Sequence, residues 1–326
     1  MSDNLKNRIT GIGNTLVDLL INESDQFLID LNKEKGGMHL VEYEDVKTIL
    51  AQTAQTPVVA TGGSACNTIV GVGNLGGAAG FIGSRGNDDY GDRFETGLIQ
   101  SGVSPRMAVG KMPTGRVLSV VTPDAQRSMF TYLGASVELD PDSIVPDMFK
   151  GSGIVVVEGY LLFNEELIRA ALKAAKSADA LIALDLSSFE VVNAAKPILG
   201  DLITNFVDIL IANEDEARAY TGIDCEKKAI DLLSKDVSYA VLKVGERGSY
   251  VSHNQKITRI EPVKGKPPVD TTGAGDLWAS GFLYGLAHGL TIEKAGHLAS
   301  VCGYEVCQVM GAQLSEKTWA RIRSLL

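Results

Sequence analysis

The sequence predicts an α/β fold in which a mainly parallel central sheet is covered by helices on both faces and carries a small β-sheet lid. In the second half of the chain, runs of apolar and β-branched residues begin at Ile154, Leu181, Asp208 and Tyr239, which are 27, 27 and 31 residues apart. This spacing is about the length of one strand and the helix that follows it. Strands that are apolar on both faces are typical of a parallel sheet buried between layers of helices.

The remaining elements of the central domain follow from the same periodicities. Residues at helical spacing predict helices at the following places: Glu165–Ser177, Glu214–Thr221, after Gly275, after Thr291, and 316–326. In the first half, the patterns predict a strand over 9–21, a helix over 65–75 and a strand over 79–82.

Two segments break this rhythm. Residues 15–41 and 107–133 contain alternating runs, such as RVLSVVT at 116–122, that suit an antiparallel sheet exposed on one face. We expect the two segments to form one small lid. The predicted core domain then comprises three pieces of the chain: 1–14, 42–106 and 134–326.

Composition narrows the classes of function. The chain has 326 residues, enough for a large core, and a net charge of −10, which argues against a general nucleic-acid binder. No apolar run approaches the roughly 20 residues that span a bilayer, and the N-terminus shows no secretory signal. The four cysteines are scattered, which suits reduced thiols. We expect a cytoplasmic protein, monomeric or homodimeric, that acts on a small molecule without contacting nucleic acid or membrane.

The string DTTGAGD at 270–276 leads into a predicted helix. The small residues Gly273, Ala274 and Gly275 leave backbone N–H groups unobstructed at the positive end of that helix, which predicts an anion hole. A carboxylate repels a resting phosphate, so we expect Asp276 to face an incoming hydroxyl and to accept its proton. The alternative is that Asp276 only caps the helix. No GxxxxGK[ST] string occurs, and Gly11-Ile12-Gly13 is too short for a dinucleotide fingerprint.

The DTTGAGD string resembles the C-terminal signature of the ribokinase-like (PfkB) family of carbohydrate and nucleoside kinases. Four other segments resemble family motifs in the same order: GNTLVD at 13–18, GGSACN at 62–67, NEDE at 213–216 and KVGERG at 243–248. The resemblance covers nearly the whole chain. It implies a ribokinase-like three-layer α/β/α sandwich and a kinase that uses ATP and Mg²⁺, with K⁺ as an additional cation.

The resemblance also assigns an acceptor site near the first strand and its glycine turn, made by Asp18, Asn14, Gly62, Gly63, Ser64, Asn67 and Arg127. A carboxylate at Asp18 can accept from two vicinal hydroxyls, although a lone aspartate at a strand end is more often a turn residue. Arg127 would swing over the phosphates, or simply be a surface charge. If the acceptor is a nucleoside, we expect its purine to be surrounded by apolar lid side chains such as Leu16, Leu40, Leu118 and Leu133.

On the nucleotide side, the resemblance assigns Asn213, Lys243, Gly245, Gly248, Thr272, Gly273 and Gly275 to ATP. Asn213 and Glu216 would place hydrated Mg²⁺, because magnesium keeps water and takes few protein ligands. On spacing alone they are a helix-capping pair. Asp270 would hold K⁺. Many members of the family have an asparagine near adenine where this chain has Ser300, which leaves the adenine contacts unassigned.

Together these features predict ATP-dependent phosphoryl transfer to the hydroxymethyl group of a nucleoside, with adenosine converted to AMP. The GNTLVD string and the position of Arg127 favour the adenosine-kinase-like branch. A sugar kinase acting on ribose, fructose or a related sugar is the alternative. A non-catalytic ligand-binding relative is a third hypothesis, and the intact GAGD string argues against it.

Overall fold

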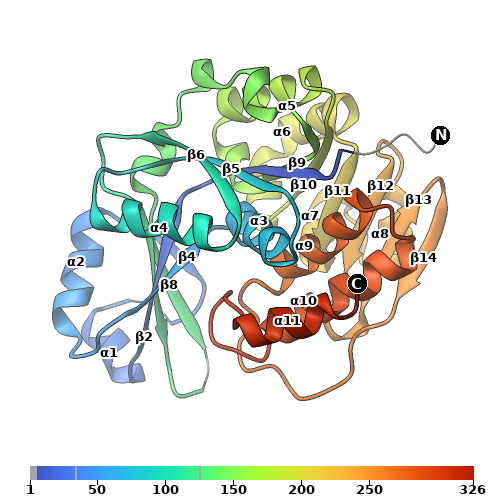
Figure 1. Ribbon diagram of the computed structural model, residues 1–326. Coiled ribbons are helices and arrows are strands. Elements are labelled where there is room, and N and C mark those ends of the chain that lie inside the picture. Colours follow the sequence, from blue (N-terminus) through green and yellow to red (C-terminus); the bar gives the residue numbers. More distant parts are fainter. Residues whose placement is uncertain (1–5, 34, 125) are drawn as a thin grey trace.

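The computed structural model describes residues 6–33, 35–124 and 126–326, and its strands form two sheets (Figure 1). In the described residues the large sheet has nine strands, in the spatial order β14 (Lys256–Ile260), β13 (Ser249–His253), β12 (Tyr239–Lys243), β11 (Ile209–Asn213), β10 (Leu181–Asp185), β9 (Ser152–Glu158), β1 (Arg8–Ile12), β5 (Ala79–Arg85) and β6 (Val103–Val109). Residues 1–5 of the predicted core, and 34 and 125 of the predicted lid, lie outside the described residues.

The large sheet is parallel from β12 to β6, and only β13 and β14 run antiparallel to their neighbours. Its apolar strands alternate between two cores. Ile154 and Val156 face one core, whereas Val155 and Val157 face the other. Since side chains alternate across a strand, a continuous apolar run requires a helical layer on each face.

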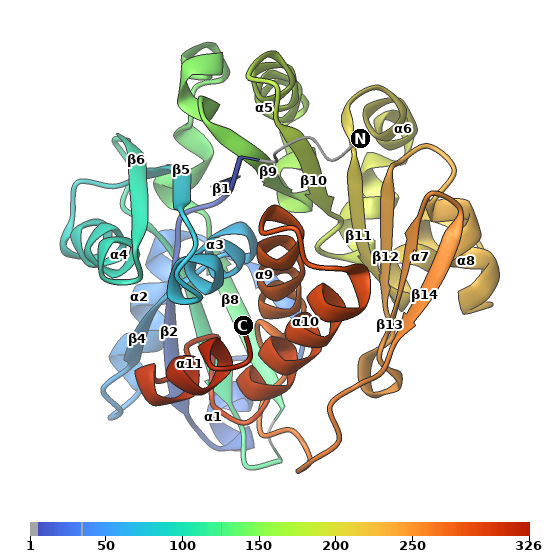
Figure 2. The same cartoon turned by 45° about the vertical axis from the view of Figure 1, so that its right-hand side comes forward.

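Two groups of helices supply these layers (Figure 2). One face packs against α3 (Ser64–Asn74), α4 (Asp89–Gln100), α9 (Ala274–Ala287) and α10 (Ile292–Val306). The other packs against α5 (Glu165–Ser177), α6 (Phe189–Phe206), α7 (Glu214–Thr221) and α8 (Glu226–Leu233). Helix α11 (Glu316–Arg323) closes a small core with α9 and α10. This is the predicted three-layer α/β/α sandwich, which the structure confirms. No helix in these described ranges is both long and apolar enough to cross a membrane.

The small sheet has, among the described residues, five strands in the order β3 (Met38–Leu40), β8 (Arg127–Tyr132), β7 (Gly115–Val121), β2 (Leu16–Asn22) and β4 (Val58–Gly62). Helices α1 (Asp25–Asp30) and α2 (Tyr43–Gln52) pack on it. The predicted lid segments lack β4, which the structure pairs with β2.

Two predictions about this part of the chain were wrong. The single strand expected over 9–21 is two strands in different sheets, because the chain leaves β1 at Gly13, enters β2 at Leu16, and changes sheet between them. The small sheet is mixed, since β2 pairs with β7 in parallel, and β7 is buried throughout. One face of β7 packs on the core through Leu118, and the other covers a cavity through Val117 and Ser119.

Candidate active site

A cavity of about 1370 Å³ opens between the carboxyl ends of the large sheet's strands and one face of the small sheet. Five polar residues reach it from the ends of neighbouring parallel strands: Asn14 after β1, Glu158 on β9, Asp185 on β10, Asn213 on β11 and Lys243 on β12. The cavity is larger than one small ligand needs, which suits a site for two molecules at once. Ligands of open α/β sheets bind at this edge.

The start of α9 forms one wall. Gly273 has a φ of 72°, in the left-handed region, and a Cβ there would lie 2.7 Å from the Cβ of Ala312, so glycine is required. No side chain caps the helix. The N–H groups of Gly275 and Asp276 have no hydrogen-bond acceptor within the described chain. They are free to bind an anion at the positive end of the helix.

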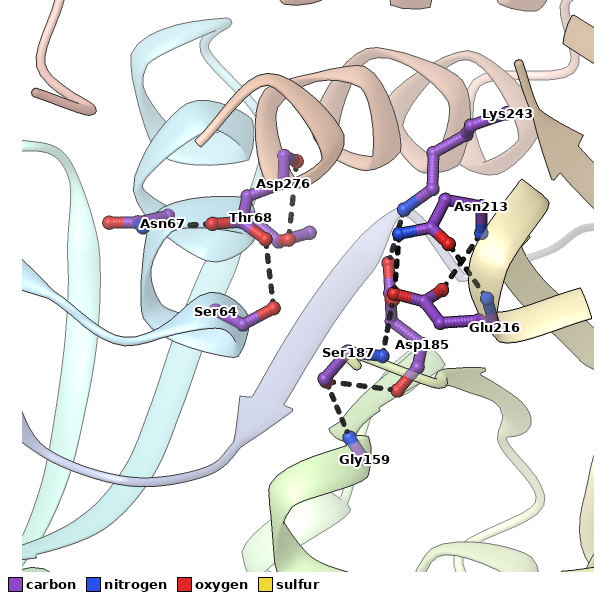
Figure 3. Close-up of polar contacts among 10 residues, drawn as sticks. All are labelled: Ser64, Asn67, Thr68, Gly159, Asp185, Ser187, Asn213, Glu216, Lys243 and Asp276. Carbon is purple, nitrogen blue, oxygen red and sulfur yellow. Dashed lines mark hydrogen bonds and ion pairs between the residues drawn. The ribbon is translucent and has the colours of Figure 1, made fainter. Parts of the chain in front are cut away.

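The carboxyl group of Asp276 lies in the first turn of α9 and is held from α3 (Figure 3). Ser64 Oγ donates to its Oδ1 at 2.8 Å, and Asn67 Nδ2 donates to its Oδ2 at 2.9 Å. Burial raises the pKa of Asp276 to about 6, although the hydrogen bond from Asn67 opposes that rise. A carboxyl with this pKa is ionised at neutral pH and is a stronger base than an ordinary aspartate.

Asp18 faces the cavity from β2. Within the described chain its carboxyl group has no hydrogen-bond or ion-pair partner, and Gly62 on β4 leaves room for it, since a Cβ there would lie 2.5 Å from Asp18 Oδ1. Burial raises the pKa of Asp18 to about 7, while the charge of Arg127 lowers it. An inward, unpaired carboxyl group is suited to bind hydroxyl groups of a ligand.

Glu158 is a residue that the sequence analysis missed. It is buried and accepts hydrogen bonds from the backbone and side-chain nitrogens of Asn14, both at 2.7 Å, and from Ala65 N at 3.0 Å. Burial raises its pKa to about 7. It therefore ties the end of β1 to the start of α3, beside Ser64. The available signal was a charged residue ending the apolar run IVVVE.

A second polar group lies on the other side of the α9 N-terminus (Figure 3). Asn213 and Glu216 form a reciprocal capping box, in which Asn213 Oδ1 accepts from Glu216 N at 2.9 Å and Glu216 Oε2 accepts from Asn213 N at 2.8 Å. The capping alternative raised by the spacing is therefore present, and both residues also line the cavity. Burial and the charge of Asp185 raise the pKa of Glu216 to about 7. Asp185, which accepts from Lys243 Nζ at 3.0 Å, was also missed from the sequence.

This group suits a hydrated cation better than a bare one. Among the described residues, no three His, Cys, Asp or Glu side chains gather to hold a metal ion alone. The oxygens of Asn213 and Glu216 nevertheless line one side of the cavity, and Glu216 brings a carboxylate to it. Magnesium takes one or two carboxylates and retains water, so these residues fit Mg²⁺ held with phosphate ligands.

The segment before α9 is braced by the small sheet and the C-terminal region. Asp270 accepts from Thr272 N at 2.9 Å, from Thr272 Oγ1 at 2.6 Å and from Gly311 N at 2.8 Å. Arg127 on β8 donates to Thr272 Oγ1. Thus Arg127, Asp270 and Thr272 all lie at the cavity wall next to the α9 N-terminus.

Several predicted residues lie elsewhere. The described lining of the cavity does not include Gly62, Gly245 or Gly248. A Cβ on Gly248 would lie 2.3 Å from Ile260 O, so that glycine permits close packing on β14 rather than on a ligand. Leu118 is buried in the core behind the small sheet, so its expected place in the cavity wall was wrong. Ser64 and Asn67 do line the cavity, but their side chains bond Asp276, which the prediction did not foresee.

Comparison with known proteins places the chain among small-molecule kinases. The sequence model of the pfkB family carbohydrate kinases matches residues 33–319. A 5-dehydro-2-deoxygluconokinase of Bacillus licheniformis is 29% identical over 280 residues, covering 81% of this chain and 86% of the relative. A probable sugar kinase from Rhizobium etli superposes with a TM-score of 0.89 at 32% identity, over 99% of this chain and 100% of that one. An adenosine kinase from Sinorhizobium meliloti gives 0.87 at 33%, over 97% and 99%.

Proposed function

The chain belongs to the pfkB family of carbohydrate kinases, and we propose that it transfers the γ-phosphoryl group of ATP to the 5′-hydroxyl of adenosine. The acceptor oxygen forms a bond to the γ-phosphorus while the bond from that phosphorus to the bridging oxygen breaks. The bridging electron pair leaves with ADP, and Asp276 takes the acceptor's proton. The free N–H groups of Gly275 and Asp276 stabilise charge on the group in transit.

The observation that carries the choice of acceptor is the apolar wall beside Asp18. Side chains on or next to the small sheet line this half of the cavity, together with two aromatic side chains from the segment after β9: Leu16, Met38, Leu40, Val117, Leu133, Tyr160 and Phe163. Asp18 would hold the ribose hydroxyls, with Asn14 and Gly63 nearby. A purine would cover the apolar wall and gain roughly 25 cal/mol per Å² of surface removed from water.

The nucleotide half is proposed to bind ATP with Mg²⁺. Asn213 and Glu216 would orient the hydrated cation, whose charge offsets the carboxylates around it. Arg127 and Lys243 would face the phosphates. Asp270 is a candidate to order its loop with K⁺, and faster turnover in KCl than in NaCl at equal ionic strength would test that role. Because an ATP-dependent kinase needs the cellular ATP pool, and the four cysteines are free, we propose a cytoplasmic protein.

A simple sugar is the second candidate acceptor. Two hydroxyl groups, Ser119 Oγ and Thr131 Oγ1, interrupt the apolar wall, and Thr131 Oγ1 is buried with no partner among the described residues. Such a group favours a ligand that brings a polar atom to it. Ring hydroxyls of a sugar could do so, as could a nitrogen of a purine.

A panel of acceptors tests the proposal. The purified protein is given ATP and Mg²⁺ with adenosine, inosine, guanosine, cytidine, ribose, fructose, 2-keto-3-deoxygluconate or fructose 6-phosphate. We expect adenosine to have the highest kcat/KM and the product to carry phosphate on the 5′-oxygen, as judged by ³¹P NMR. A sugar or sugar phosphate that exceeds adenosine tenfold would make the chain a sugar kinase.

A further inference from the structure

Lys243 is a partly buried cation next to the N-terminus of a helix. Its side chain is 14% exposed, and Nζ lies 3.0 Å from the position that a Cβ on Gly275 would occupy. The ammonium group therefore touches the first turn of α9. The N-terminus of a helix is itself positive. The Lys243 ammonium group and the N-terminus of α9, side by side at the cavity wall, together favour the binding of an anionic ligand there.

Asp185 holds the ammonium group there (Figure 3). Its Oδ2 accepts from Lys243 Nζ at 3.0 Å, while its Oδ1 accepts from Ser187 N at 3.1 Å. Each carboxylate oxygen therefore has a separate task, one on the backbone after β10 and one on Lys243. Asp185 is buried at 6% exposure, so the geometry of the pair is fixed by the sheet rather than by solvent.

The surroundings also show why the pair is not simply structural. Glu216 and Asp276 lie near enough for their charges to act on Lys243 together with that of Asp185. Burial alone lowers the pKa of Lys243, but these carboxylates outweigh it and raise the pKa, so the side chain stays charged. A permanent charge that lines a cavity next to free helix N–H groups is suited to bind phosphate oxygens.

We propose that Lys243 contacts the phosphoryl group in transit and that Asp185 is the positioning residue that aims Lys243 at the start of α9. The inference rests on the proposed kinase function and adds two roles to it. Lys243 acts beside the Gly275 N–H group, on the transferred group rather than on the adenine or ribose. Asp185 touches neither substrate and acts only through Lys243.

A double-mutant cycle tests the pair. Lys243→Met should lower kcat roughly a hundredfold, the loss expected for one donor to transition-state charge, and Asp185→Asn about tenfold. If Asp185 acts through Lys243, the double variant should be no slower than Lys243→Met, because the two losses do not add. If the two residues had independent structural roles, their effects would multiply and kcat of the double variant would fall about a thousandfold. Lys176→Met is the matched control, since Lys176 pairs with Asp208 on the surface and is expected to leave kcat unchanged.

Binding provides a readout that does not depend on turnover. In calorimetry, Lys243→Met should weaken a non-hydrolysable ATP analogue at least tenfold while ADP binding changes less than twofold. Equal losses for both nucleotides, or none for either, would overturn the proposal. If Lys243→Met does not fold because Asp185 is left unpaired, Asp185→Asn and the double variant are compared instead, and a tenfold difference in kcat is expected. If the wild type binds the analogue but phosphorylates no acceptor, the kinase proposal fails and the binding comparison still decides this one.

Discussion

Asn67 and Asp276 are 209 positions apart in the chain, yet Asn67 Nδ2 donates to Asp276 Oδ2 at 2.9 Å. Ser64, from the same turn of α3, occupies the other carboxylate oxygen at 2.8 Å. The two contacts fix the rotation of the carboxyl group while leaving lone pairs of both oxygens free. The segment 62–67 therefore orients the carboxyl group of Asp276, in addition to any contact that this segment makes with an acceptor.

Replacing the base is the first prediction. Asp276→Asn keeps the size of the side chain but removes its basicity, and general-base catalysis contributes about 10²–10⁴ in rate. We expect kcat to fall at least about a hundredfold, with little change in the KM for ATP. Steady-state kinetics and a thermal melt would show whether the loss is chemical. A variant that keeps a tenth of wild-type kcat at normal stability would remove Asp276 from the mechanism.

The pH profile is a second test of the same carboxyl groups. The pKa of Asp276 is raised to about 6 and that of Asp18 to about 7, and both groups work in the ionised form. Hence kcat/KM should fall as the pH drops below about 7, and more steeply than one decade per pH unit below about 6. In Asp18→Asn the remaining activity should fall no more steeply than one decade. A wild-type profile that is flat from pH 8 to pH 5 would contradict both assignments.

A substitution at Glu216 distinguishes a role in magnesium binding from a role in capping helix α7. Glu216→Gln keeps a carbonyl oxygen for the capping box but loses the charge that orients a hydrated cation. We expect a several-fold rise in the Mg²⁺ concentration for half-maximal rate, with the KM for the acceptor nearly unchanged. Asp215→Asn, in the same turn but exposed, is the control. A lower melting temperature with an unaltered Mg²⁺ titration would show that Glu216 only caps the helix and does not act on the cation.

Much of this architecture follows from local sequence patterns. The helices at Glu165–Ser177 and Glu214–Thr221 and the four strands of the second half were predicted from apolar periodicity, because their faces are buried uniformly by neighbouring layers. The single strand over 9–21 was wrong because a change of sheet at Gly13 leaves no mark on an apolar run. Leu118 was misplaced for a related reason: alternation gives two faces, but not which of them borders the cavity.

The site residues were harder to predict from the sequence than the fold. Asp276 and Asp18 lie in short motifs with backbone glycines, so their chemistry could be inferred locally. Glu158 and Asp185 act through partners far away in sequence, Ala65 and Lys243 respectively, and each ends an apolar strand without a motif of its own. Only the register of parallel strands brings them to the same edge of the sheet.

Asp18 should reduce stability when no ligand is bound. Its pKa is raised from 3.8 to about 7, so the protonated form is favoured by folding; the stability that it contributes is present at low pH and is lost as the pH rises through about 7. Asp18→Asn cannot ionise, and should therefore melt at least about 1 °C above the wild type at pH 8, with a smaller difference at pH 5, closer to the unfolded pKa of 3.8. Asp142→Asn, exposed and outside the cavity, is the control. A lower melting temperature at pH 8 would show that Asp18 has a stabilising partner.

The apolar wall decides between a nucleoside and a free sugar, and Leu40 on β3 is the side chain that tests it. Leu40 lines the cavity and is 65% exposed, so a purine would have much apolar surface to cover. Leu40→Ala removes part of that surface, and at roughly 25 cal/mol per Å² the loss is about 1 kcal/mol. We therefore expect kcat/KM for adenosine to fall roughly five- to tenfold, mostly through KM.

A bare sugar has little apolar surface to place against Leu40, so the activity of Leu40→Ala toward ribose should stay within a factor of two of the wild type. Val58→Ala is the matched control, because Val58 is 67% exposed on the same sheet and does not line the cavity. The kcat/KM of Val58→Ala should equal that of the wild type for both adenosine and ribose. If Leu40→Ala lowers the rates for adenosine and ribose equally, the wall closes the site without recognising a base, and the preference for a nucleoside must then arise elsewhere in the cavity.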